Sequence, residues 1–151
     1  MPGPKGYISP SGWFDWLSRV PLDVRLELPG GVRTLCVHIA PGQDDGAGLH
    51  PKLTDAELAR HVREASADLV VARHTHRPMD RPIDGVRVLN VGSVNNPQAG
   101  DRRACYSILE ASEAGYTIEQ FRVEYDYRSV IDAIRRSRHP TGEFIARHFL
   151  S

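Results

Sequence analysis

The sequence lacks several features that would point to a particular partner. Its 19 basic residues are balanced by 19 acidic ones, so no net charge draws it to a nucleic acid polymer or to an anionic membrane. No apolar run reaches the roughly 18 residues that a membrane span needs, so we expect no membrane segment. Only two of the basic residues are lysines, and an arginine excess of this kind is more typical of genome composition than of phosphate binding.

Cysteine is also scarce. Cys36 and Cys105 are the two cysteines, and both lie in segments that have the pattern of buried strands. No secretory leader with a basic and an apolar region precedes them. We therefore expect reduced core thiols and a cytoplasmic protein.

The length of 151 residues predicts a single domain. Residues 1–12 contain three prolines and three glycines and have no periodic apolar face, which indicates an irregular lead-in. The domain is expected to run from 13 to 151, and no internal repeat divides it.

The apolar pattern predicts an α/β fold with a mixed sheet and flanking helices. Apolar and charged residues alternate at 22–28, which predicts a strand with one solvent-exposed face. Short apolar runs are typical of strands buried on both faces, and such strands are expected at 32–38, where Leu35, Cys36 and Val37 form the run, and at 68–72 and 86–91. Strands at 104–110 and 116–124 are expected to form a hairpin.

Helices are predicted at three places along the chain. A short apolar helix or turn is expected at 13–17. Thr54 and Glu57 form a capping-box signature, which opens a helix to about residue 65. Asp126 or Ser129 is expected to cap a final helix, which Pro140 ends.

Polar residues follow three of the buried strands at the point where each strand ends. His38 ends the first, His74 and His76 follow the second in ARHTHRP, and the third runs into Gly92 and Ser93. Open α/β sheets bind ligands beyond the carboxyl ends of their strands. Imidazole is the usual nitrogen ligand for zinc, manganese and iron. One histidine alone is usually an ordinary loop residue, but three in matched positions predict a metal site.

These segments resemble a known family. The segments VHIAP at 37–41, ARHTHRP at 72–78 and NVGSVNNP at 90–97 are similar, in the same order, to VHGxP, GHTHxP and NPGSxxxP of calcineurin-like metallophosphoesterases. The small prokaryotic phosphodiesterases are the branch that the chain resembles most, over about residues 13–140. The resemblance implies part of a four-layer α/β/β/α sandwich.

The resemblance also implies a dinuclear site that hydrolyses phosphate esters with a hydroxide held by the metals. His38 and His74 would bind one divalent metal and His76 the other, and manganese, iron, zinc and nickel all suit such ligands. The substrate is expected to meet Arg73, Asn90 and Ser93. A guanidinium can hold a phosphate through two hydrogen bonds, although Arg73 stands where the family has a glycine that permits tight backbone geometry.

The family's first-half motifs are missing from the sequence. No Asp-x-His, Gly-Asp-x-x-Asp or Gly-Asn-His occurs. Two dications about 3.5 Å apart repel by roughly 19 kcal/mol at an effective dielectric constant of about 20, and neutral imidazoles do not offset this. Asp44, Asp45 and Asp80 lie near the histidines in sequence, but loop acids of this kind are more commonly solvated. We therefore expect at most one metal.

The missing half of the fold has a further consequence. It would contribute a whole sheet, so the remaining sheet is expected to expose an apolar face that self-association or a partner chain covers. Two interpretations remain open. The chain is either part of a phosphoesterase that a longer chain or a partner completes, or a non-catalytic remnant that acts as a binding module.

Overall fold

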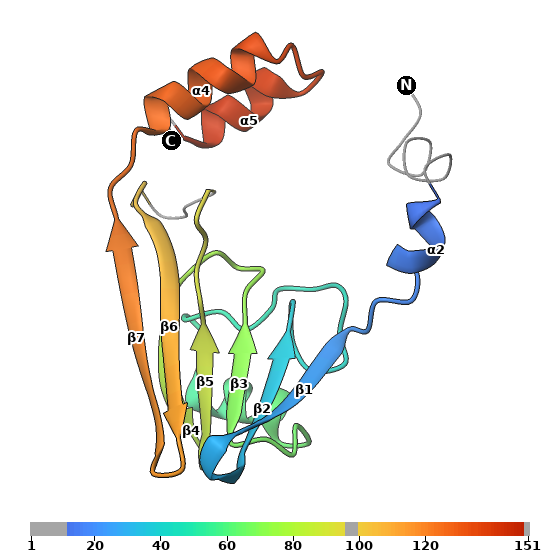
Figure 1. The fold of residues 1–151 in the computed structure, drawn as a ribbon, viewed down its shortest axis with the longest axis vertical. Helices are drawn as coiled ribbons and strands as arrows, with labels where there is room; N and C mark the ends of the chain where they lie inside the picture. Colours follow the sequence, from blue (N-terminus) through green and yellow to red (C-terminus); the bar gives the residue numbers. More distant parts are fainter. Residues whose placement is uncertain (1–11, 96–99, 150–151) are drawn as a thin grey trace.

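The computed structural model describes residues 12–95 and 100–149, so the predicted lead-in lies outside the described residues except for Gly12. The chain forms a five-stranded sheet in the order β1-β2-β3-β5-β4 and a separate two-stranded hairpin, β6-β7 (Figure 1). The strands are β1 Asp23–Leu28, β2 Val32–Val37, β3 Leu69–Ala72, β4 Met79–Ile83, β5 Val86–Asn90, β6 Ala104–Ser112 and β7 Gly115–Val123. The mixed α/β sheet that the sequence predicts is confirmed.

The three central strands run in the same direction. β2 pairs with β3 and β3 pairs with β5 in parallel, whereas β1 and β4 are antiparallel strands at the two edges. The carboxyl ends of β2, β3 and β5 therefore lie side by side. They form the carboxyl edge of the sheet, which is the end toward which the arrowheads of these strands point in Figure 1. This is the edge at which the sequence places its candidate ligands.

The helices lie in different places. They are α2 Trp13–Leu17, α3 Asp55–Val62, α4 Tyr127–Arg136 and α5 Gly142–His148, with a short 3-10 turn, η2, at Pro29–Gly31. α3 packs on one face of the five-stranded sheet, and α4 and α5 pack against each other beyond the ends of β6 and β7 (Figure 1). None of the described helices has both the length and the apolar character to cross a membrane. The sequence does not predict β4 or α5.

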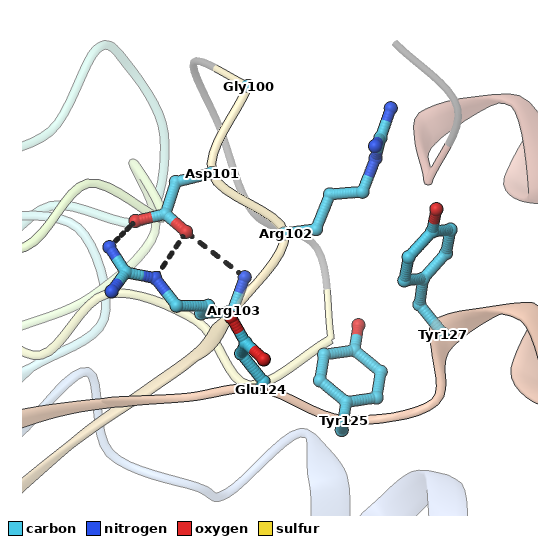
Figure 2. A pocket seen from close by; sticks show the side chains of 7 residues that line it. All are labelled: Gly100, Asp101, Arg102, Arg103, Glu124, Tyr125 and Tyr127. Carbon is cyan, nitrogen blue, oxygen red and sulfur yellow. Dashed lines mark hydrogen bonds and ion pairs between the residues drawn. The ribbon is translucent and has the colours of Figure 1, made fainter.

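A cavity of about 430 Å³ lies where the hairpin meets α4 (Figure 2). The guanidinium of Arg102 lies 5.1 Å from the ring centroid of Tyr127, which is cation–π geometry. Asp101 binds the guanidinium of Arg103 through 2.9 Å hydrogen bonds. No residue that the sequence predicts for the metal site lines this cavity.

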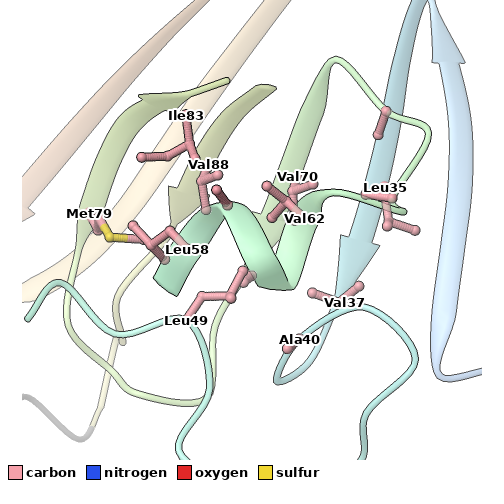
Figure 3. Packing of buried hydrophobic residues seen from close by; sticks show 14 of the residues in the cluster. Leu35, Val37, Ala40, Leu49, Leu58, Val62, Val70, Met79, Ile83 and Val88 are labelled. Carbon is pink, nitrogen blue, oxygen red and sulfur yellow. The ribbon is translucent and has the colours of Figure 1, made fainter. Parts of the chain in front are cut away.

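The core lies between α3 and the face of the sheet that it covers (Figure 3). Leu35, Val70 and Val88 occupy neighbouring positions on β2, β3 and β5, and all three are fully buried. Leu58 and Val62 of α3 pack on them. Packing of α3 holds the three parallel strands in place, and it therefore determines where their carboxyl ends lie.

The hairpin covers part of the opposite face. The side chain of Gln120 donates a 2.9 Å hydrogen bond to the carbonyl of Asn90 at the end of β5. At the other end of the hairpin, a Cβ on Gly30 would lie 3.0 Å from the carbonyl oxygen of Ser112, so η2 packs closely against the hairpin turn. The hairpin is thereby held across the sheet at both ends.

The apolar face of β1 is not covered. Val24 is 45% exposed and Leu26 is 49% exposed, so the prediction that one face of this strand is buried is wrong for the chain by itself. Tyr106 and Ile108 on the outer face of the hairpin are exposed as well. Apolar side chains are therefore exposed both on β1 and on the hairpin.

Both cysteines are free thiols. Cys36 in β2 is half-buried and Cys105 in β6 is buried, and burial raises the pKa of each thiol. Neither thiol is activated as a nucleophile or as a metal ligand.

The capping box of α3 forms as the sequence predicts. The Thr54 side chain accepts a hydrogen bond from the Glu57 N–H, and the Glu57 carboxylate accepts one of 2.8 Å from the Thr54 N–H. Two N–H groups that the helix leaves without partners are thus satisfied.

Replacing Thr54 with alanine should lower the free energy of unfolding by about 1 kcal/mol, because the first turn of α3 loses its cap. Urea unfolding followed by circular dichroism measures the change. Thr141→Ala is the matched control, since Thr141 stands at the N-cap of α5 but makes no side-chain capping hydrogen bond. An equal loss in the two variants would contradict the role of the capping box.

Candidate metal centre

The ends of β2 and β3 bring two of the predicted ligands together. His38 directly follows β2, and His74 lies in the turn that follows β3. The Arg73 N–H donates a 3.2 Å hydrogen bond to the His38 carbonyl, which ties the two strand ends to each other. Both imidazoles therefore stand at the carboxyl edge of the sheet.

The two rings face each other through one nitrogen each. Nε2 of His38 lies 3.3 Å from Nδ1 of His74, and the ring planes meet at 75° with centroids 5.2 Å apart. Two imidazole nitrogens that bind a tetrahedral metal at about 2.0–2.1 Å lie about 3.3 Å apart. The spacing of His38 and His74 thus fits a shared metal ion as well as it fits a direct hydrogen bond.

The other nitrogen of His74 has a backbone partner. Nε2 of His74 lies 3.2 Å from the carbonyl oxygen of Gly46. A carbonyl only accepts, so the proton of a neutral His74 belongs on Nε2, and Nδ1 carries the lone pair that points toward His38. Metal-binding histidines are commonly oriented in this way by a carbonyl on their far nitrogen.

The surroundings of His38 favour its neutral ring. Desolvation lowers the pKa of His38 below its ordinary value, and the positive charges of His74, Arg73 and His76 lower it further. Neutral imidazole is the form that binds metals.

The role of His76 as a ligand of the other metal stays a prediction. Within residues 12–95 and 100–149, no group of three or more histidine, cysteine, aspartate or glutamate side chains is placed to hold a metal ion. Asp44 and Asp45 lie on an exposed loop. Asp80 on β4 already forms an ion pair with Arg87 on β5, with 2.7 Å between Oδ2 and Nη2. The described part of the chain thus offers two close nitrogen ligands and no carboxylate beside them.

The turn after β3 has an uncommon backbone conformation. His74 has a φ of 59° and His76 has a φ of 57°, and residues other than glycine rarely adopt this left-handed region. Arg73 does not have a positive φ. Arg73 therefore stands before His74 without the strain of a left-handed backbone.

The three residues predicted to meet the substrate lie in different environments. Arg73 is exposed beside the histidine pair. Asn90 is 0% exposed, and its side-chain amide donates to backbone and hydroxyl oxygens of the neighbouring loops. Ser93 is buried, and its carbonyl accepts a 2.8 Å hydrogen bond from the Cys105 N–H. Contact of these residues with a substrate stays a prediction.

Sequence reasoning missed the loop that lies over His74. Gly46 contributes a carbonyl and Gly48 packs against the ring, where a Cβ would lie 3.2 Å from Cδ2 of His74. A backbone carbonyl leaves no signal in a sequence. The abundance of glycine in this segment was the only available indication, and it marks many loops.

Comparison with known proteins gives a consistent result. Residues 12–114 match the calcineurin-like phosphoesterase superfamily domain. The fold matches the crystal structure of a hypothetical protein from Pyrococcus horikoshii OT3 with a TM-score of 0.77 and 17% identity, over 95% of this chain and 55% of that chain. It matches a metallophosphoesterase from Sphaerobacter thermophilus with a TM-score of 0.70 and 21% identity, over 90% of this chain and 59% of that one. The chain thus spans a little over half the length of these structures. No curated protein matches it.

Proposed function

Because this chain belongs to the calcineurin-like phosphoesterase superfamily, we propose that it supplies the histidine side of a metal-dependent phosphoesterase site. His38 and His74 would hold one divalent metal. The observation that carries the proposal is the 3.3 Å approach of their ring nitrogens at the carboxyl edge of the sheet. Manganese, iron, zinc and nickel all accept such ligands.

The chain's own residues would then bind and orient a phosphate ester. A divalent metal, when bound, would offset negative charge on the phosphoryl oxygens and lower the pKa of a coordinated water. The exposed guanidinium of Arg73 would bind a phosphoryl oxygen beside the pair. His76 would be a ligand of a second metal only when further ligands come from outside the described residues.

The remaining ligands would come from another polypeptide unit. The matched structures contain a large part, more than two fifths of each chain, that has no counterpart here. The apolar side chains of Val24, Leu26 and Ile108 offer a surface on which such a unit could pack. A second copy of this chain is the other partner that this surface allows.

A non-catalytic binding module is the second candidate. The observation that favours it is the absence of carboxylates around His38 and His74 within the described residues. Such a module would hold at most one metal and would not turn over a substrate.

Hydrolysis of a chromogenic phosphodiester in excess manganese separates these possibilities. If a second copy completes the site, we expect turnover by the purified chain that a His74→Ala, His76→Ala double variant loses. If a different polypeptide completes it, we expect metal binding that depends on His74 without turnover until that unit is supplied. Turnover that survives in the double variant would contradict the proposal, and so would a wild-type chain that binds no metal. Metal binding without turnover, whichever metal or partner is supplied, would support the binding module.

A further inference from the structure

We infer that Asn90 and the loop over His74 form a clamp that fixes the tautomer and orientation of this ring before any metal arrives. The clamp consists of the Gly46 carbonyl, the Gly48 backbone and the Asn90 side chain. It deepens the proposed function, on which it rests, by assigning positioning residues to the same site.

The first contact selects the tautomer of His74. The Gly46 carbonyl lies 3.2 Å from Nε2 and can only accept a hydrogen bond. With the proton held on Nε2, the lone pair of Nδ1 points toward His38 Nε2 at 3.3 Å. The opposite tautomer would lose the carbonyl contact and would place a proton where the metal is expected.

The second contact is steric. Gly48 has a φ of 69°, and a Cβ at this position would lie 3.2 Å from Cδ2 of His74 and 3.2 Å from Cγ2 of Thr75. Such contacts require the neighbours to shift. Glycine therefore allows the loop to lie close enough over the ring for the Gly46 carbonyl to reach Nε2.

The third contact holds the backbone on both sides of His74. The Asn90 amide donates hydrogen bonds of 2.6 Å to the Arg73 carbonyl and 3.0 Å to the Thr75 hydroxyl. The same nitrogen lies 3.3 Å from the carbonyl of Leu49, where the loop ends, so this carbonyl shares one of the two amide hydrogens. One buried amide thus ties the loop to the turn and supports the left-handed conformation of His74, whose φ is 59°.

These contacts give Asn90 a role that differs from substrate contact. The Asn90 Oδ1 accepts a 3.0 Å hydrogen bond from the Gly92 N–H, so both ends of its amide have partners within the protein. The amide therefore positions a ligand residue. Pre-organised metal ligands lose less conformational freedom on binding, so the clamp should raise the metal affinity of the pair.

Gly48→Ala tests the clamp, and Gly42→Ala is its matched control. Gly42 lies in the same loop with a φ of 67°, but a Cβ there would meet no atom within 4 Å. Both variants therefore carry a similar backbone strain, and only the first pushes on His74. Zinc titration by calorimetry should show an affinity about 10 to 100 times lower for Gly48→Ala than for Gly42→Ala, with similar melting temperatures. Equal zinc affinities in the two variants would overturn the inference.

A tautomer measurement keeps the test independent of metal binding and of the folding of a variant. Long-range proton–nitrogen correlation spectra of the metal-free wild-type chain should show neutral His74 with its proton on Nε2. A proton on Nδ1 would overturn the clamp. A wild-type chain that shows the expected tautomer but binds no zinc would overturn the proposed function and leave the clamp intact.

Discussion

His38→Ala should lower the affinity of the chain for zinc by more than about 100-fold, because losing a direct ligand should cost at least as much as losing the outer partners that orient one. The structure offers two nitrogens 3.3 Å apart, and with His38 removed a single imidazole remains. His74→Ala should have the same effect. Isothermal titration calorimetry with zinc and with manganese measures both.

Two other histidines provide the controls for this prediction. His61 lies on α3, so His61→Ala should leave the affinity within about threefold of the wild type. His76→Ala should do the same for the single metal proposed at His38 and His74, because the proposed function assigns His76 to a second metal. Zinc affinity that is unchanged in His38→Ala would place the metal elsewhere in the protein. A large loss in His76→Ala would show that the turn after β3 rearranges when metal binds.

Asn90→Ala should lower the free energy of unfolding by about 2–4 kcal/mol, since each buried polar group left without a partner costs roughly 1–3 kcal/mol. The substitution removes the partner of the Gly92 N–H and a donor to the carbonyls of Leu49 and Arg73. Little water can replace it, because Asn90 is completely buried. Urea unfolding measures the loss, and we expect thermal unfolding to follow it with a lower melting temperature.

Asn95→Ala is the control for Asn90. Asn95 is exposed in the same strand-end loop, and its substitution should change stability by less than about 0.5 kcal/mol. Similar small changes in the two variants would mean that the hydrogen bonds of Asn90 contribute little. The clamp over His74 would then have to rely on Gly46 and Gly48 alone.

The sequence predicts the helices and strands that are determined by residues within the same segment. Thr54 and Glu57 identify the start of α3, and Asp126 identifies that of α4, because a side chain within four residues satisfies each helix end. β2, β3 and β5 stand out because each contains a short apolar segment with buried residues. For these segments the local pattern and the tertiary structure agree.

The elements that the sequence does not predict depend on distant contacts. β4 contains Asp80, Arg81 and Pro82, so it has no strand-like pattern, and it forms because β5 lies beside it. α5 is short and follows Pro140. It is stabilised by packing of Ala146 and Phe149 on α4. Neither contact can be inferred from nearby residues.

The candidate site divides in the same way. Strand ends place His38 and His74 at one edge of the sheet, and that rule needs only the order of the strands. The distance between the rings and the position of the Gly46 carbonyl depend on the path of the loop and on the left-handed turn. The sequence thus identifies which residues meet, but not how they are oriented.

The two edges of the five-stranded sheet differ in their ability to accept another strand. On β4, Pro82 has no N–H to donate, so this edge strand resists extension. β1 has no proline, and its exposed side carries Val24 and Leu26. The sheet can therefore be extended by a further strand more readily at β1 than at β4. An additional strand should join at β1, and unwanted association should begin there as well.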